Sequence, residues 1–170
     1  MKKYLLGACL FLSTQVFAYT GSTLDFTELI FNQAMMESLK ENFDGADIAK
    51  QQCMGNALKP SMDRLAGTYL DEILTENEQK LMDKFFDTPL GQEMFQELRT
   101  GDLRSFGEGI DLDKYNEADY QQYMSVLDKY YREGDVTATL SADEELLAIM
   151  FVSLLMCDMM DFEEKPSKAQ

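Results

Sequence analysis

The chain has 170 residues, of which 15 are Lys or Arg, 31 are Asp or Glu and none is His, so its formal net charge is −16. An acidic protein is repelled by nucleic acid and by anionic lipid, which excludes both as natural partners. The absence of histidine excludes Ser-His-Asp and Cys-His triads and the usual zinc sites. The length fits one domain with a single core.

The first residues have the pattern of a secretory signal peptide. Met1-Lys2-Lys3 precedes an apolar run from Tyr4 to Leu12, and Val16-Phe17-Ala18 is a small-residue cleavage pattern. We therefore predict a signal peptide over residues 1–18, secretion across the inner membrane of a bacterium, and a mature periplasmic chain from Tyr19. Loss of two lysines would leave 13 basic against 31 acidic residues, a net charge of −18.

The cysteine count favours one disulfide. Cys9 would leave with the signal peptide, and Cys53 and Cys157 would remain, an even number in an oxidising compartment. A bond between these two would close a long loop and stabilise the fold by roughly 4 kcal/mol on the chain-entropy model. The alternative, two buried free thiols, stays open at this point.

The first half of the mature chain has helical periodicity. The spacing predicts a helix over 24–43, with Asp25 and Glu28 resembling a capping box at its start. A second helix is predicted from Asp47, and Lys59-Pro60 either kinks it or forces a new start. The stretch from Met62 to Ile73 then carries a regular amphipathic stripe.

Two helices and a tight corner follow. Thr75-Glu76-Asn77-Glu78 is a capping box that opens a helix ending near Phe86. Thr88 is expected to cap the next helix, with Pro89 at its first position, where a missing N–H costs nothing. Gly91 is expected to let the two helix ends approach closely, and Gly101 to end the second helix.

The segment 102–114 is predicted to be an irregular connection packed by its apolar side chains. Asn116 then caps a helix over 117–132, which Gly134-Asp135 ends. A cluster of tyrosines gathers here, and helical spacing favours packing of most of them in the core over a recognition surface; they are Tyr115, Tyr120, Tyr123, Tyr130 and Tyr131.

The last helix is predicted to begin at Ser141, in a second capping box, and to continue to Cys157. It is apolar on all sides, which is typical of the buried centre of a bundle, and it is too short to span a membrane. We therefore predict an all-α fold: a single compact bundle of six or seven helices around a buried C-terminal helix. The domain would cover 19–162, with a flexible tail over 163–170.

Residues Leu74 to Leu98 resemble a known family. The phrase Leu74-Thr75, Glu78, Leu81, Phe85-Phe86-Asp87-Thr88-Pro89-Leu90-Gly91-Gln92-Glu93-Met94 is similar to the phrase that marks the domain of unknown function 2059, a family of secreted bacterial helical proteins. In that family a capped helix with aromatic residues at its end meets Ser/Thr-Pro-x-Gly and a further helix. The resemblance implies an α-helical envelope protein and implies no catalytic residue.

Carboxylates are the available source of chemistry. A pair of acids could serve a glycoside hydrolase, but 31 acids supply many spacings by chance, and a solvated helix face explains them better; the candidates are Glu72, Glu76, Glu78, Asp83 and Glu93. Asp111-x-Asp113 followed by acids suggests calcium, yet Tyr115, Asn116 and Gln122 stand where an EF-hand loop needs a ligand, a glycine and a bidentate Glu. We predict no metal and no cofactor.

The sequence thus favours a non-catalytic, acidic periplasmic protein that binds a protein partner with a cationic surface, as an inhibitor or immunity-type protein blocking a toxin or hydrolase in the envelope. The alternative is an envelope chaperone or assembly factor, and a carboxylate-based hydrolase comes third. The predicted contact residues are Asp71, Glu72, Glu76, Glu78, Glu108, Asp111, Asp113, Glu117 and Asp119.

Overall fold

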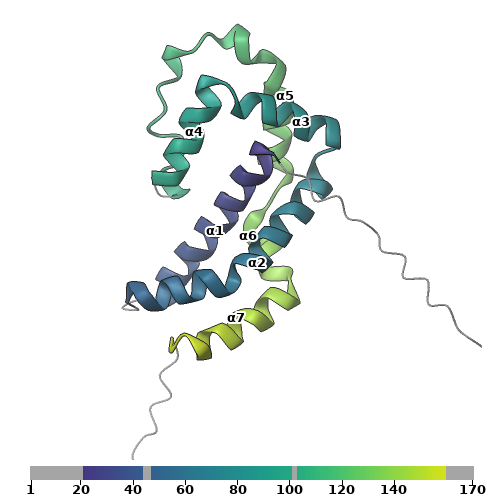
Figure 1. The fold of residues 1–170 in the computed structure, drawn as a ribbon. Helices are drawn as coiled ribbons and strands as arrows, with labels where there is room; N and C mark the ends of the chain where they lie inside the picture. The colour runs from purple at the N-terminus through teal and green to yellow at the C-terminus, as the bar shows by residue number, and fades with distance from the viewer. Residues whose placement is uncertain (1–20, 44–46, 101–102, 160–170) are drawn as a thin grey trace, which may run out of the picture.

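The structure, a computed structural model, describes residues 21–43, 47–100 and 103–159. These residues form seven α-helices, two short 3-10 helices and no strand (Figure 1), which confirms the all-α prediction. The elements are α1 (Ser22–Asn42), α2 (Ile48–Ile73), α3 (Glu76–Phe86), α4 (Pro89–Thr100), η1 (Leu103–Ser105), η2 (Leu112–Lys114), α5 (Glu117–Glu133), α6 (Val136–Ala142) and α7 (Glu144–Met156). The predicted signal peptide and C-terminal tail lie outside the described residues.

The core is built around α1. This helix packs against α2, α3, α4 and α6, while α5 packs on α3 and α7 packs on α2. Phe26 of α1 is fully buried, with its ring centroid 4.5 Å from that of Phe86 and 5.2 Å from that of Phe95. In Figure 1, α3, α4 and α5 gather at one end of α1, and α7 lies along α2 at the other end.

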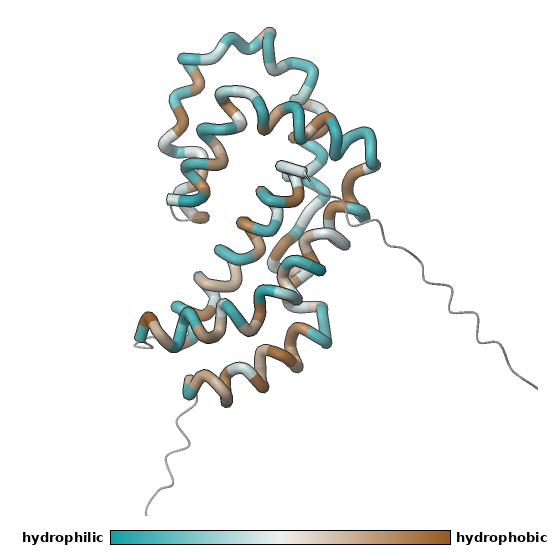
Figure 2. Tube along the Cα trace, in the orientation of Figure 1, coloured by the Kyte–Doolittle hydropathy of each residue, from teal (hydrophilic) through white to brown (hydrophobic). Residues whose placement is uncertain are grey.

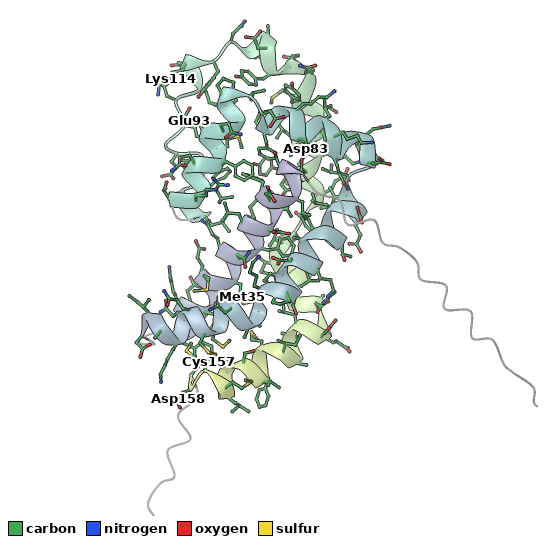
Figure 3. The ribbon with its side chains drawn as sticks, in the orientation of Figure 1. Met35, Asp83, Glu93, Lys114, Cys157 and Asp158 are labelled. Carbon is green, nitrogen blue, oxygen red and sulfur yellow. A yellow bond between two sulfur atoms is a disulfide. The ribbon has the colours of Figure 1, made fainter. Side chains whose placement is uncertain are left out.

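The start of α1 differs from the prediction. Asp25 and Glu28 do not form a capping box: α1 begins at Ser22, and its N-cap, Gly21, has no side chain to supply a hydrogen bond. Asp83 of α3 takes that role, because its Oδ1 accepts from both the N–H and the hydroxyl of Thr23 at 2.8 Å (Figure 3). A cap from a residue 60 positions away leaves no trace in local spacing.

Helix α2 runs through Pro60 without a break. Asp47 caps it by accepting from the Lys50 N–H at 2.8 Å, and the helix continues to Ile73, so the new start considered at Lys59-Pro60 is wrong. The helix changes direction along its length in Figure 1, as a helix with an internal proline does. Pro60 is exposed, so water can satisfy the carbonyl that loses its helical partner.

The corner between α3 and α4 has the predicted chemistry. Thr75 and Glu78 form the capping box, and the Thr88 hydroxyl accepts from the Gly91 N–H at 3.2 Å. A Cβ atom on Gly91 would lie 2.3 Å from the backbone oxygen of Phe85, closer than any packing permits. Only glycine fits there without moving the backbone of α3.

The predicted helix start at Ser141 is wrong. Ser141 lies inside α6, a helix that the sequence patterns did not indicate, and its hydroxyl donates to the Ala138 carbonyl at 3.0 Å. Asp143 is the N-cap of α7 and accepts from the Leu146 N–H at 2.7 Å. A serine whose hydroxyl bonds within its own helix is not free to cap the next helix.

The predicted burial of the C-terminal helix is also wrong. In α7 only Leu146, Ser153 and Leu154 are buried, whereas Phe151 is 55% and Met156 is 79% exposed. Figure 2 shows α7 as an apolar helix along most of its length, on the outer side of α2. Apolar character all round a helix predicts burial only if neighbours cover every side, and here the centre is already filled by α1 and its partners.

Candidate functional site

The N-terminal end of α7 is fixed to α2 by charge. Arg64 of α2 lies 3.0 Å from a carboxylate oxygen of Asp143 and 3.2 Å from one of Glu145. The Leu146 N–H and, to a lesser degree, the Arg64 guanidinium lower the pKa of Asp143, so the cap stays ionised. The first turn of α7 therefore has a defined place on α2.

The C-terminal end of α7 is fixed by a disulfide. Cys157 is bonded to Cys53 of α2, with a Cα–Cα distance of 5.7 Å, which confirms the predicted pairing. The Lys50 ammonium lies 3.3 Å from the carboxylate of Asp158, and Figure 3 shows Cys157 and Asp158 where α7 ends beside α2. Asp158 has a φ of 54°, and the Met159 N–H donates to the Leu154 carbonyl at 2.9 Å, which closes the helix end.

Between these two anchors, α7 presents an apolar face to solvent. We define the α7 apolar face as Leu147, Phe151, Val152, Leu155 and Met156, whose exposed fractions are 41, 55, 52, 42 and 79%. Most of these residues stand on the side of the helix away from Leu146 and Leu154, which pack on the core, and Leu147, seven residues before Leu154, stands at the edge of the face. Clustered exposed apolar side chains on a helix mark an interaction site more often than isolated ones do.

The predicted acidic contact residues form two separate groups. Asp71, Glu72, Glu76 and Glu78 lie at the end of α2 and the start of α3, and Glu108, Asp111, Asp113, Glu117 and Asp119 lie from the loop after η1 to the first turn of α5. Glu78 contacts Lys129 near the end of α5, whereas Glu117 begins the same helix, roughly 18 Å away along its axis at 1.5 Å per residue. The structure thus does not unite the two groups into one surface.

Several of these acids already have internal partners. The Lys129 ammonium, 2.8 Å from Glu78, and the Thr75 N–H lower the pKa of Glu78 to about 2. Glu76 pairs with Lys80 at 2.5 Å. In the second group Asp111 lies 3.7 Å from Lys114, and in the first Asp71 accepts from Gln79 at 3.1 Å. These contacts stabilise helix ends and turns.

Among the described residues no group of three or more Asp, Glu, Cys or His side chains has the arrangement of a metal site. The acids around Asp111 to Asp119 that suggested calcium are spread over η2 and the first turn of α5. The carboxylates of Glu117 and Asp119 stand where the N-terminal helix dipole favours negative charge.

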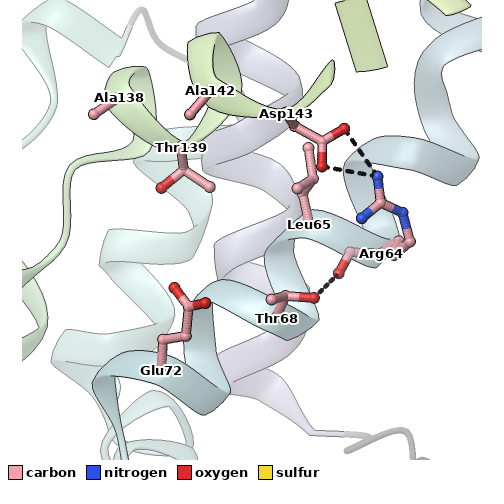
Figure 4. A pocket seen from close by; sticks show the side chains of 8 residues that line it. All are labelled: Arg64, Leu65, Thr68, Glu72, Ala138, Thr139, Ala142 and Asp143. Carbon is pink, nitrogen blue, oxygen red and sulfur yellow. Dashed lines mark hydrogen bonds and ion pairs between the residues drawn. The ribbon is translucent and has the colours of Figure 1, made fainter. Parts of the chain in front are cut away.

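An open groove of about 440 Å³ lies between α2 and α6 (Figure 4). Its polar lining includes Arg64, Glu72 and Asp143, and the dashed contacts in Figure 4 show Arg64 bound to Asp143. Both charges therefore serve the attachment of α7. The two hydroxyls of the lining, on Thr68 and Thr139, each donate to a backbone carbonyl one turn earlier, whereas chemistry in the groove would need a nucleophile paired with a base.

Two carboxyls that the sequence patterns did not single out, Glu28 of α1 and Asp63 of α2, interact with each other. Burial and the negative charge of Asp63 raise the pKa of Glu28. Lys59 donates to both oxygens of Asp63 at 2.8 and 2.9 Å. Neither carboxyl lines the α2–α6 groove.

The predicted packing of most tyrosines in the core holds in part. Tyr123 and Tyr130 are buried, Tyr115 and Tyr120 are half-buried, and Tyr131 is 48% exposed. The Tyr130 hydroxyl is hydrogen-bonded to the Thr27 hydroxyl of α1 at 3.0 Å, and burial raises its pKa. The tyrosines of α5 thus mainly attach that helix to the core.

Comparison with protein-family models, with curated proteins and with solved structures finds no match to this chain. In the described part of the chain, no helix has both the length and the hydropathy that a membrane crossing requires. The α7 apolar face was missed from the sequence. One local signal in the sequence points to it: acidic residues stand at both ends of the apolar run, with Glu144 and Glu145 before it and Asp158 after it.

Proposed function

We propose that the protein is a non-catalytic, secreted periplasmic protein that binds one protein partner, as an inhibitor or immunity-type protein of the bacterial envelope. The observation that carries the proposal is the α7 apolar face, a set of large side chains held in a fixed position and left open to solvent. The signal-peptide pattern, the disulfide and the resemblance over Leu74 to Leu98 support the location.

The energetics fit a partner of moderate affinity. Full burial of a large apolar side chain contributes about 1.5 to 3 kcal/mol. The five side chains of the α7 apolar face are on average about half exposed, so covering them would contribute roughly 4 to 8 kcal/mol. Association costs a comparable free energy, because both molecules lose translational and rotational freedom. The face therefore acts as the centre of an interface, and polar contacts around it supply the remaining binding free energy.

The residue inventory supports binding over turnover. The chain has no histidine, Asp143 at the α2–α6 groove is paired with Arg64, and Glu76 and Glu78 at the start of α3 are paired with lysines. A carboxylate-based hydrolase would need two acids free to exchange protons in one cleft, and Asp143 is instead committed to Arg64 and to the cap of α7.

An envelope chaperone or assembly factor is the second candidate, because Met156 is 79% exposed and methionine adapts its shape to different apolar clients. The two candidates differ in the number of partners. An inhibitor forms a stoichiometric complex with one enzyme and abolishes its activity. A chaperone protects several unfolded clients from aggregation.

Site-specific photocrosslinking in the envelope of the source cell tests the proposal. A photoreactive phenylalanine analogue replaces Phe151, and as a matched control it replaces Leu112, which is 65% exposed in η2. One crosslinked species at position 151 and none at 112, followed by a stoichiometric complex of the purified proteins that silences the partner, is the expected result. Many species at 151 would favour the chaperone. No adduct at 151, or the same adducts at both positions, would refute the proposal.

A further inference from the structure

We infer that the α7 apolar face binds a single basic amphipathic helix of the partner, with Lys or Arg residues flanking its apolar stripe. This inference rests on the proposed function and names the class of partner segment. It follows from the arrangement of side chains on α7, from the charges at its ends and from the size of the face.

The exposed side chains stand in two adjacent rows, each with a spacing of four residues. One row is Leu147, Phe151 and Leu155, and the other is Ala148, Val152 and Met156. Such rows are the ridges by which helices pack, and the groove between two of them accepts the corresponding ridge of a second helix. Ala148 is the smallest member, so it leaves room for a larger side chain near the N-terminal end.

The charges around the face select a cationic partner. Glu144 continues the Ala148 row by one turn and is exposed, and Glu145 stands beside it. Asp158 follows the other end with its side chain 80% exposed, and there its carboxylate is paired with Lys50. A partner helix with a basic residue about one turn beyond its apolar stripe would meet Glu144, and Glu145 beside it, at the start of α7.

Size and charge disfavour a second copy of this chain. The exposed parts of the five side chains amount to an area on the order of 300 to 500 Å². A stable dimer needs about 800 Å² from each subunit. Two copies would also bring together two chains that each carry a charge of −16. The face suits one helix better than an equal, like-charged surface.

A membrane surface fits the face less well than a helix does. Helices that lie on membranes carry Lys and Arg beside their apolar side, where these residues meet anionic headgroups. The described residues of α7 include Glu144 and Glu145 and no Lys or Arg. A bilayer with anionic lipid would repel this end of the protein.

The test is a titration of the disulfide-bonded protein from Tyr19 to Gln170 into fluorescent peptides, followed by anisotropy. The probe is a peptide of ~18 residues made of leucine and lysine, with leucines at helical intervals, long enough for a marginally stable helix. A second peptide replaces lysine by glutamate, and a third has the first composition in a scrambled order. We expect saturable 1:1 binding of the first peptide alone, weakened by salt.

Variants locate the site. The double variant Phe151→Ser/Val152→Ser should weaken binding by about tenfold or more. Leu112→Ser, which removes an equally exposed apolar side chain elsewhere, should leave binding unchanged. Glu144→Lys should weaken binding of the lysine peptide. Circular dichroism and a thiol count confirm that each variant is folded and oxidised.

Four outcomes would overturn the inference: equal binding of all three peptides, equal loss with Leu112→Ser, preferential binding to neutral phosphatidylcholine vesicles, or a dimer that Phe151→Ser/Val152→Ser dissolves in sedimentation. A missing peptide signal together with a specific crosslink at position 151 rejects the basic helix and leaves the proposed function standing. If the peptide binds but no crosslink forms at position 151 in the cell, the proposed function is rejected, although the face can still bind a basic helix.

Discussion

Removal of the Cys53–Cys157 disulfide should release α7 before the rest of the fold. The bond joins residues 104 positions apart, and a loop of about 100 residues corresponds to ~4.7 kcal/mol on the chain-entropy model. Measured losses for native disulfides are typically about 2 to 5 kcal/mol, so the double variant Cys53→Ala/Cys157→Ala should lower the free energy of unfolding by roughly 3 to 5 kcal/mol.

The position of α7 decides where that loss appears first. Apart from the disulfide, the helix is attached through a few apolar side chains and three ion pairs, and surface ion pairs contribute only about 0 to 1 kcal/mol each. The side chains are Leu146, Ile149, Met150 and Leu154, and the ion pairs are those of Arg64 with Asp143 and Glu145 and of Lys50 with Asp158. A helix of 13 residues is marginal in water by itself, so its attachment maintains its structure. The α7 amides should therefore open as a local unit when the bond is lost.

Urea unfolding measures the global change, and native-state hydrogen exchange resolved by residue measures the local one. Exchange in α7 should accelerate by at least about tenfold more than in α1, and reduction of the wild-type protein should reproduce the double variant. Equal acceleration in α1 and α7, or an unfolding free energy within about 1 kcal/mol of the wild type, would contradict the reasoning.

Three further predictions concern the core and its helix ends. Gly91→Ala should cost at least ~3 kcal/mol, because the new Cβ would lie 2.3 Å from the Phe85 carbonyl oxygen and α4 must shift; a loss below ~1 kcal/mol in urea unfolding would mean that the corner is not so tight. Glu78 has a pKa of about 2 against an ordinary 4.5, so its contribution is present above pH 4.5 and is lost as the pH falls toward 2. Glu78→Gln should therefore reduce stability by about 1 kcal/mol at pH 7 and leave it nearly unchanged at pH 2, and an equal loss at both values would exclude the contact with Lys129 as its cause. Phe26→Ala should cost about 3 to 5 kcal/mol by leaving a cavity among aromatic rings, as read from the thermal midpoint together with calorimetric enthalpy, and a shift of only a few degrees would place the core elsewhere.

The features that the sequence predicted correctly are governed by neighbouring residues. The capping box at Thr75, the corner at Thr88-Pro89 and the close approach at Gly91 depend on backbone chemistry within a few positions. The disulfide is the exception, since it joins residues 104 positions apart; its pairing followed because only two cysteines lie beyond the predicted signal peptide.

The features that the sequence missed depend on residues far apart in the chain. Nothing near Ser22 indicates that Asp83 caps α1, and the Ser141 and Thr75 patterns look equivalent although only Thr75 is a cap. The periodicity of α7 indicates an apolar helix but not which of its sides find neighbours. The candidate site is the side of α7 that no neighbouring element covers, so it could be located only from the three-dimensional fold.

The cap that Asp83 provides to α1 imposes an order on biosynthesis. A ribosome makes α1 first, yet the helix gains its N-terminal cap and its packing on α3 and α4 only once residues through α4 exist. A nascent chain that ends before α3 offers α2 for α1 to pack on but lacks the cap from Asp83, so α1 is less stable then than in the complete fold.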